Sequence, residues 1–184
     1  MKDISFHILD IAQNSLHAGA DKIVIEIIEN TKEGTLKLTI TDNGSGMDQN
    51  RVDRVSDPFF TSSTTKRVGL GLPLLKQNAE QTGGLFDVSS ELNKGTVVTA
   101  VFNTRNIDMI PEGDLAATMR TLIASDPLKD FIYRQEIDGK EFELDTAAMR
   151  EELGDIDLSR REVLTFIDEF VRSNVSVLHE KISG

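Results

Sequence analysis

The hydrophobic positions of residues 1–106 alternate between helical and strand-like spacing. Residues 4–18 carry apolar or small side chains at helical intervals, which predicts an amphipathic helix ended by Gly19: Ile4, Ile8, Ile11, Ala12 and Ser15. Strand-like runs follow at 22–29 and 36–41, and again at 85–91 and 96–102. Between these pairs we expect a short helix over 48–55, a mobile loop over 56–68, and a helix over 70–82 that starts just after Gly69. Hairpins and helices in this order predict an α+β fold, a two-layer sandwich with a mixed, mostly antiparallel sheet and one helical layer.

The chain continues into a second, helix-rich region. Residues 107–184 hold 18 acidic and 9 basic residues, against 13 and 11 in residues 1–106, so we place a boundary near residue 106. Helices are expected over 112–124 and 146–153, and Asp138-Gly139 is a strong hairpin signal. Ser159 and Glu162 form a capping-box pattern that would open a helix to about residue 180.

This last predicted helix has an apolar stripe made of Val163, Phe166, Ile167, Phe170, Val171, Val175 and Leu178. Core packing is the first interpretation of such a stripe. The alternative is a contact with a partner protein, or a homodimer formed through the C-terminal helix.

Composition narrows the function classes. The formal charge is −11, which disfavours nonspecific binding to nucleic acid or to anionic membranes. The chain has no cysteine and only three histidines, which excludes disulfides, thiolate catalysis and a metal site rich in His or Cys. Neither a signal peptide nor an apolar run of membrane-spanning length is present, so we expect a cytoplasmic protein with no membrane partner.

Two segments place polar chemistry at element ends. Asp10 and Asn14 are four residues apart, which puts both on one face of the first helix. Residues 42–47 (DNGSGM) follow a strand that should be half buried. The carboxylate of Asp42 would accept a hydrogen bond from an amino group there, and the glycines permit close approach of a flat ligand. For Asp10 and Asn14 alone, an ordinary solvated helix face is the favoured interpretation, and residues 42–47 alone are equally compatible with a surface turn.

Two further segments lie around the second predicted helix. Residues 58–63 (PFFTSS) put two adjacent aromatic side chains in a polar stretch, where they would anchor a lid. Gly69, Leu70 and Gly71 open the helix, and free N–H groups at a helix N-terminus bind phosphate. Lys66 and Arg67 precede them, and a cation there would meet a γ-phosphate or remain solvated.

In this order and spacing, the four segments resemble the ATP-binding domain shared by sensor histidine kinases, DNA gyrase B, heat-shock protein 90 and MutL. This is the GHKL superfamily, whose domain is called the Bergerat fold. Residues 42–47 look like its G1 box, 58–62 its F box and 68–76 its G2 box, and the helix with Asp10 and Asn14 looks like its N box. Residues 95–99 (GTVVT) are similar to its closing GT motif, so the resemblance covers about residues 1–103.

The resemblance implies roles for individual residues. Asn14 would ligate the Mg²⁺ that bridges the phosphates of ATP, and Asp42 would bind the adenine amino group. Gly44 and Gly46 would let the base and sugar pack against backbone, Met47 would line the adenine pocket, and Thr99 would support adenine through water. Backbone donors at Gly69, Leu70 and Gly71, with Lys66, would hold the phosphates. ATP, ADP and Mg²⁺ are thus the expected ligands.

Asp10 departs from the family pattern, in which a glutamate usually stands four residues before the asparagine. Aspartate is one methylene shorter, and misplacing a general base by about 1 Å can cost on the order of 100-fold in rate. The substitution therefore weakens catalysis more than nucleotide binding. Residues 58–76 look most like histidine kinases, whereas 14–20 look more like the N box of MutL and heat-shock protein 90.

Three functions remain open from the sequence. The first is a stand-alone kinase-like protein that uses Asp10 to transfer the γ-phosphoryl group to a histidine or serine of a partner protein. The second is a noncatalytic switch that binds a partner according to its nucleotide. The third, ranked last, is an ATPase of the MutL or gyrase kind, because the acidic tail is short for a transducer domain.

Overall fold

The computed structural model describes residues 2–57, 59, 70–180 and 182. In this part of the chain six strands form one sheet in the order β3-β4-β2-β1-β5-β6. The strands are β1 (Lys22–Asn30), β2 (Thr35–Asp42), β3 (Leu85–Glu91), β4 (Gly95–Asn103), β5 (Asp130–Ile137) and β6 (Lys140–Asp145). The helices are α1 (Ile4–His17), α2 (Gln49–Val55), α3 (Gly71–Gln81), α4 (Leu115–Ser125), α5 (Thr146–Leu153) and α6 (Arg161–Glu180).

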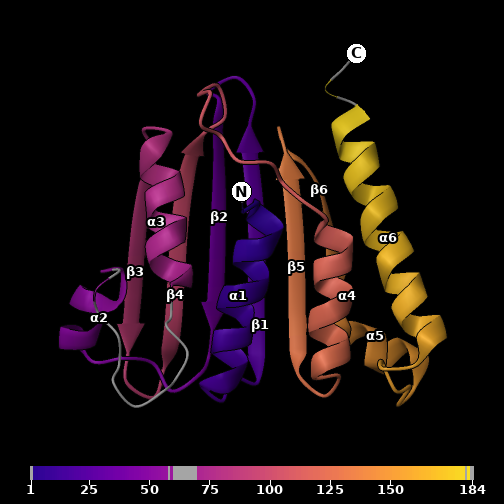
Figure 1. Cartoon of the computed structure of the whole chain (residues 1–184). Helices are drawn as coiled ribbons and strands as arrows, with labels where there is room; N and C mark the ends of the chain where they lie inside the picture. Colours follow the sequence, from indigo (N-terminus) through magenta and orange to yellow (C-terminus); the bar gives the residue numbers. More distant parts are fainter. Residues whose placement is uncertain (1, 58, 60–69, 181, 183–184) are drawn as a thin grey trace.

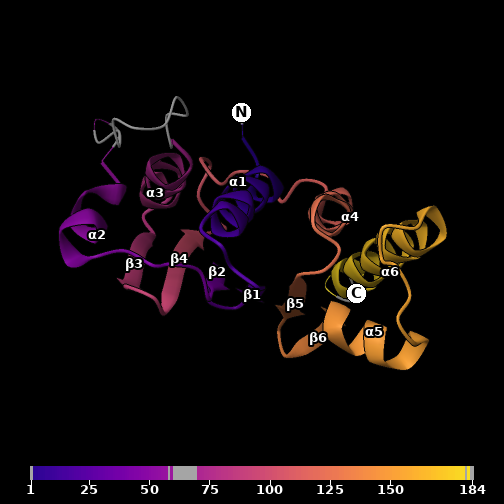
Figure 2. The ribbon, with the colours of Figure 1, turned by 90° about the horizontal axis from the view of Figure 1, so that it is seen from below.

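The sheet and the helices form two layers. Figures 1 and 2 show α3, α1, α4 and α6 side by side over one face of the sheet. Only the β1–β5 pair is parallel, and the other four pairs are antiparallel. The predicted α+β class, with a mixed and mostly antiparallel sheet under a helical layer, is confirmed.

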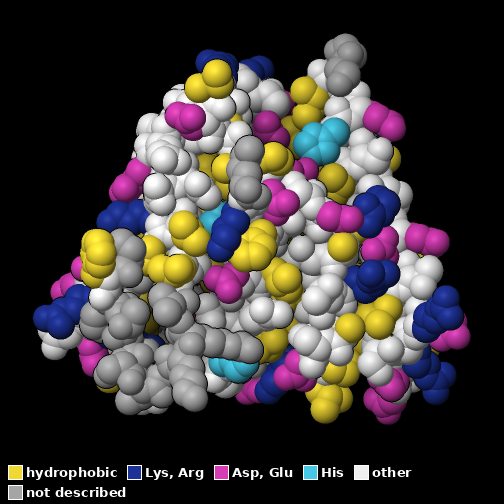
Figure 3. All heavy atoms as spheres, in the orientation of Figure 1, with side chains coloured by type: hydrophobic (Ala, Val, Ile, Leu, Met, Phe, Trp, Pro, Cys, Tyr) yellow, Lys and Arg dark blue, Asp and Glu magenta, His cyan; other side chains and the backbone are white. Residues whose placement is uncertain are grey.

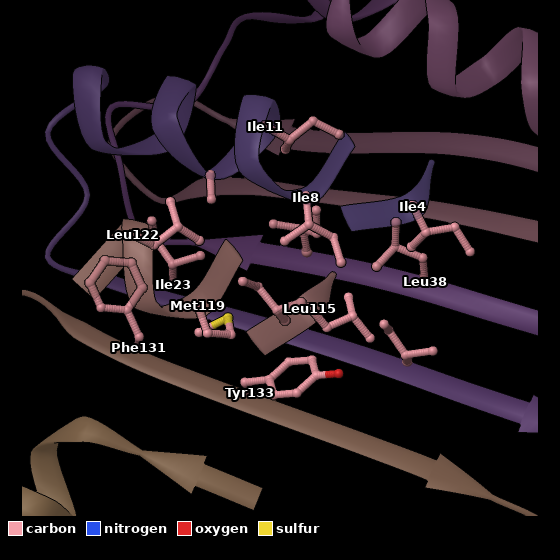
Figure 4. Packing of buried hydrophobic residues seen from close by; sticks show 14 of the residues in the cluster. Ile4, Ile8, Ile11, Ile23, Leu38, Leu115, Met119, Leu122, Phe131 and Tyr133 are labelled. Atoms are coloured by element: carbon pink, nitrogen blue, oxygen red, sulfur yellow. The ribbon is translucent and has the colours of Figure 1, made fainter. Parts of the chain in front are cut away.

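The core lies between these layers. Figure 4 shows side chains of α1 and α4 pointing onto the strands, with Ile4, Ile8 and Ile11 above Ile23 and Leu38. Each of these five side chains is at most 5% exposed. Burying one aliphatic side chain of this size contributes about 1.5–3 kcal/mol, so the helical spacing of α1 fixes which of its faces meets the sheet.

The region after residue 106 shares this sheet and core. Strand β5 pairs with β1, with Lys22 opposite Asp130. The carbonyls of Pro111 and Glu112 accept 2.9 Å hydrogen bonds from the first N–H groups of α1. Those N–H groups have no acceptor within their own helix, so the linker before α4 supplies the missing partners.

Two helix starts in the region after residue 106 differ from the sequence prediction. Helix α4 begins at Leu115, three residues later than expected, because the Asp114 carboxylate accepts from Ala117 N and caps the helix there. Helix α6 begins at Arg161, and the Ser159 hydroxyl donates to Asp157 at 2.6 Å. The expected cap at Ser159 is therefore replaced by a turn held by Asp157.

The apolar stripe of α6 is partly in the core. Ile167 and Val171 are fully buried and Leu178 nearly so, whereas Phe166 is 54% exposed. The stripe thus packs mainly within the chain, as its first interpretation predicted. No helix in the described residues combines the length and the apolar character that crossing a bilayer requires.

Candidate functional site

Asp42 ends strand β2 with both carboxylate oxygens in defined hydrogen bonds. The Ser15 hydroxyl donates to Oδ2 at 2.6 Å, and the backbone N–H of Gly44 donates to Oδ1 at 2.8 Å. Ser15 is 4% exposed on α1, so the helix and the strand end are joined here. A carboxylate offers about four lone-pair positions, so Asp42 keeps acceptor capacity for a ligand.

Sequence reasoning placed Ser15 in the buried stripe of α1 and did not assign it a role at the site. The signal was present, because a hydroxyl in an otherwise apolar stripe must find a hydrogen-bond partner when it is buried. The partner, Asp42, is 27 residues away and is identified only once α1 lies over β2.

The loop after Asp42 is attached to two neighbouring segments. Ser45 N donates to the Ala18 carbonyl at 2.9 Å, and Met47 N donates to the Ser90 hydroxyl at 2.8 Å. At Gly46, where φ is +65°, an added Cβ would come within 2.0 Å of the Glu91 carbonyl oxygen. Gly46 therefore lets the loop approach the β3–β4 turn, whereas the family resemblance implied that it makes room for a ligand.

Gly44 is more directly part of the site. A Cβ at this position would lie 3.1 Å from both the Ala18 carbonyl oxygen and Asp42 Oδ1. The loop is thus tightly packed where its N–H group reaches Asp42. Met47 is half-buried at the far end of the loop.

Asp10 meets the start of α3. Its Oδ2 atom is 1.9 Å from the point that a Cβ on Gly71 would occupy, so the carboxylate lies against the backbone of the first residue of α3. Leu70, at the N-cap position, makes no side-chain capping hydrogen bond. The structure thus brings the expected catalytic carboxylate and the expected phosphate-binding helix start together.

Asn14 is exposed one turn after Asp10 on α1. Its position at the end of α1 puts it on the same end of the sheet as the Asp42 loop and the start of α3, at the bottom of Figure 1. Among the described residues, no group of three His, Cys, Asp or Glu side chains is arranged to hold a metal ion. An ion here would have few protein ligands, and an exposed carboxamide oxygen fits the preference of Mg²⁺ for oxygen donors.

Thr99 is not brought to this cluster. It lies opposite Thr39 of β2, on the sheet face away from the helices, since its neighbours Val98 and Ala100 are buried under them. Thr96 is the residue opposite Asp42. The structure therefore places Thr96, and not Thr99, beside Asp42.

Several expected site residues lie outside the described residues. They are Lys66 and Gly69, together with Arg67 and most of the 58–63 segment. Phe59, the described member of that segment, is 91% exposed. Leu70 is described and is 41% exposed at the start of α3.

His7 links α1 to α3 one turn before Asp10 on α1. It is fully buried, and its Nε2 lies 2.8 Å from the Asn78 side-chain amide. Burial, and secondarily the nearby Lys2 charge, lower the pKa of His7 to about 4. A neutral imidazole at this position accepts from Asn78, so His7 has a structural role in holding the two helices that carry Asp10 and Gly71.

One protein family, described as histidine kinase-, DNA gyrase B-, and HSP90-like ATPase, matches residues 3–106. The chain belongs to this family. The resemblance to the GHKL superfamily is thereby confirmed, and residues 3–106 are its nucleotide-binding module.

Two proteins with similar sequences are kinases by name. The sensor histidine kinase ZraS of Klebsiella oxytoca is 29% identical over 93 residues, which is 50% of this chain and 20% of that protein. Sporulation kinase D of Bacillus subtilis is 35% identical over 94 residues, 50% of this chain and 18% of that protein. The chain thus spans about a fifth of the length of these relatives.

Solved structures agree on the fold over more of the chain. The MutL ATPase domain of Aquifex aeolicus complexed with ADP has a TM-score of 0.54 at 15% identity, covering 83% of this chain and 68% of that one. At this identity the likeness concerns the fold alone. Its coverage is wider than the family match, so the arrangement of elements extends beyond residue 106.

Proposed function

We propose that the chain binds ATP with Mg²⁺ between α1, the Asp42 loop and the start of α3, and that it transfers the γ-phosphoryl group to a partner protein. The observation that carries the proposal is the Asp42 carboxylate, held by Ser15 and Gly44 at the end of β2. A pre-oriented carboxylate with free acceptor capacity selects a ligand with an amino group, as adenine has.

The adenine end of the site comes from β2, β4 and the loop. Asp42 accepts from the amino group, Thr96 stands beside it on β4, and Gly44 leaves the backbone close to the base. Met47, half-buried at the end of the loop, lines the pocket. These residues bind and orient the base, and they discriminate adenine from a base that has a carbonyl at this position.

The phosphate end comes from α1 and α3. The N–H groups of Leu70 and Gly71 at the open helix start donate to phosphate oxygens, and the family resemblance adds Gly69, which lies outside the described residues. Lys66 adds a positive charge, and Asn14 supplies the protein ligand to Mg²⁺. The bound Mg²⁺ would supply charge neutralisation during transfer.

Asp10 completes the proposal as the general base. It accepts the proton of the partner's hydroxyl, or of the imidazole nitrogen that does not attack. At the same time the attacking oxygen or nitrogen bonds to the γ-phosphorus, and the bond from that phosphorus to the β–γ bridging oxygen breaks and releases ADP. Its contact with Gly71 keeps the carboxylate beside the phosphate-binding helix start.

A second candidate is a nucleotide switch without catalysis. The observation that favours it is the same contact, because a carboxylate seated on Gly71 lies close to the phosphate-binding N–H groups and is one methylene shorter than the usual glutamate. In that case nucleotide binding would change the surface offered to the partner without chemistry.

Incubation with γ-labelled ATP, Mg²⁺ and candidate partner proteins distinguishes the two. Acid-labile label on the partner indicates a phosphohistidine, and acid-stable label indicates a phosphoserine. If the chain is a kinase, Asp10→Asn should lower phosphoryl transfer by about 100-fold or more and leave the ADP affinity within about twofold of the wild-type value. If the wild-type protein and the Asp10→Asn variant both bind ATP and neither transfers the label, the result supports the switch.

A further inference from the structure

A basic hollow lies between α4 and α6, outside the nucleotide site. Its volume is about 690 Å³. It is lined by Arg120 and Arg161, by four hydroxyl side chains that include Ser125 and Thr165, and by Leu164 on its apolar side. No carboxylate is among the lining residues, although residues 107–184 hold 18 acidic residues and 9 basic ones.

The two arginines are less neutralised by carboxylates than three other arginines of the same region. Arg134, Arg150 and Arg172 each lie within 3.1 Å of a carboxylate oxygen. The ion-pair contact of Arg120 is 3.9 Å long, to Asp168; its charge also acts on Asp114, and its side chain is 51% exposed. Arg161 forms no ion pair with any residue that the structure describes.

The hollow opens on the same end of the molecule as the nucleotide site. Helix α1 ends shortly before β1 and α4 ends shortly before β5, and these strands run parallel with Lys22 opposite Asp130. A 2.6 Å ion pair between Lys129 and Asp21 joins the two strand starts. Figure 2, seen from this end, shows the helices in the order α3, α1, α4, α6.

This order sets the distance between the two sites. Packed helices lie roughly 8–10 Å apart, so the α4–α6 hollow is roughly 15 Å from the axis of α1. A protein partner that covers about 800 Å² would reach from one to the other. Leu128, which is 85% exposed in the turn after Ser125, adds an apolar contact on this end.

We propose that the α4–α6 hollow docks an acidic segment of the protein that comes to the nucleotide site. The identity of that protein as phosphoacceptor rests on the proposed function, but the chemistry of the hollow does not. Guanidinium groups and hydroxyls bind carboxylates through charge-assisted hydrogen bonds, and Leu164 contacts an apolar side chain between them.

A short acidic peptide suits the hollow better than nucleic acid does. Figure 3 shows basic side chains over the first turns of α6 with acidic side chains between and around them. With a formal charge of −11, the rest of the protein repels an extended polyanion, whereas a few carboxylates fit between two arginines.

Fluorescence anisotropy on the full chain tests this with a labelled peptide of Glu-Glu-Leu repeats. The wild-type protein should bind it, and a Gln-Gln-Leu peptide should bind at least about tenfold more weakly because it has no charge. Arg120→Ser with Arg161→Ser should also lower affinity for the acidic peptide by about tenfold or more. Lys32→Ser with Lys140→Ser, which removes two exposed charges at the other end of the sheet, should change it less than about twofold.

Equal losses in the two double variants would overturn the docking site, because a general charge effect would then explain binding. So would equal affinity for the two peptides, no binding by the wild-type protein, or tighter arginine-dependent binding of a labelled oligonucleotide. ADP titration of the same proteins separates the proposals. If the protein binds the peptide but not ADP, the docking site stands and the nucleotide function is rejected. If it binds ADP but not the peptide, the nucleotide function stands and the docking site is rejected.

Discussion

Asp10 on α1 lies directly against the backbone of Gly71, the first residue of α3, although 61 positions separate them in the chain. The contact exists because residue 71 has no Cβ, which would stand 1.9 Å from Asp10 Oδ2. It joins the residue proposed as general base to the helix start proposed to bind phosphate. The position of Asp10 therefore depends on a glycine outside its own helix.

Gly71→Ala should displace Asp10 and lower phosphoryl transfer by about tenfold or more, with a smaller loss of ADP affinity. Labelled-ATP transfer and calorimetry measure the two effects. Unfolding provides a matched control: the stability that Gly71→Ala removes from the wild-type protein should be partly regained in an Asp10→Ala background. Strictly additive losses would mean that the two residues do not compete for the same space.

Ser15→Ala should leave the Asp42 carboxylate with one fewer hydrogen bond to hold its orientation. Removing the 2.6 Å hydrogen bond to a carboxylate should cost about 1.5 kcal/mol of unfolding free energy and weaken ADP binding. Urea denaturation and calorimetry measure this. Ser173→Ala is the control, since Ser173 is an exposed serine on α6 that donates to a carbonyl of its own helix, and it should change neither quantity appreciably.

Gly46→Ala should destabilise the whole fold. Both a positive φ and the 2.0 Å approach to the Glu91 carbonyl oppose a Cβ, so we expect a loss on the order of 3 kcal/mol. Gly83 has a similar φ of +82° but nothing within 4 Å of an added Cβ. Gly83→Ala should therefore lose only about 1 kcal/mol, and equal losses would show that φ alone sets the cost.

The burial of His7 predicts a pH dependence of stability. Its pKa is about 4 in the folded protein, against 6.5 for a solvent-exposed histidine, so the unfolded chain takes up a proton first as pH falls. Stability is full above pH 6.5 and is lost as the pH falls from about 6.5 towards 4, by on the order of 2 kcal/mol. Urea denaturation across this window should show a smaller loss for His7→Gln, and identical pH profiles would contradict the assignment.

Local pattern was enough to predict most of the elements. The spacing of Ile4, Ile8 and Ile11 identified α1 and its buried face, and Asp138-Gly139 marked the β5–β6 hairpin. These features depend on side chains close together in sequence, where period and turn chemistry are direct signals. The parallel pairing of β5 with β1 was not predicted, because it joins segments more than 100 residues apart.

The site was predictable only in part for the same reason. Asp42 and Gly71 were identified by motif, but Ser15 and Thr96 require the helix-to-strand packing and the β2–β4 register. Thr99 and Thr96 lie on opposite faces of the sheet, because a strand alternates its faces and the two residues are three positions apart.

The central claim is that Asp42 selects a nucleotide at this site. Calorimetric titration of the full chain with ADP, with and without Mg²⁺, tests it in wild type, Asp42→Asn and Asn14→Ala. We predict binding by the wild-type protein, loss of that binding in Asp42→Asn, and loss of the Mg²⁺ dependence in Asn14→Ala. Wild-type affinity and unchanged Mg²⁺ dependence in both variants would contradict the account.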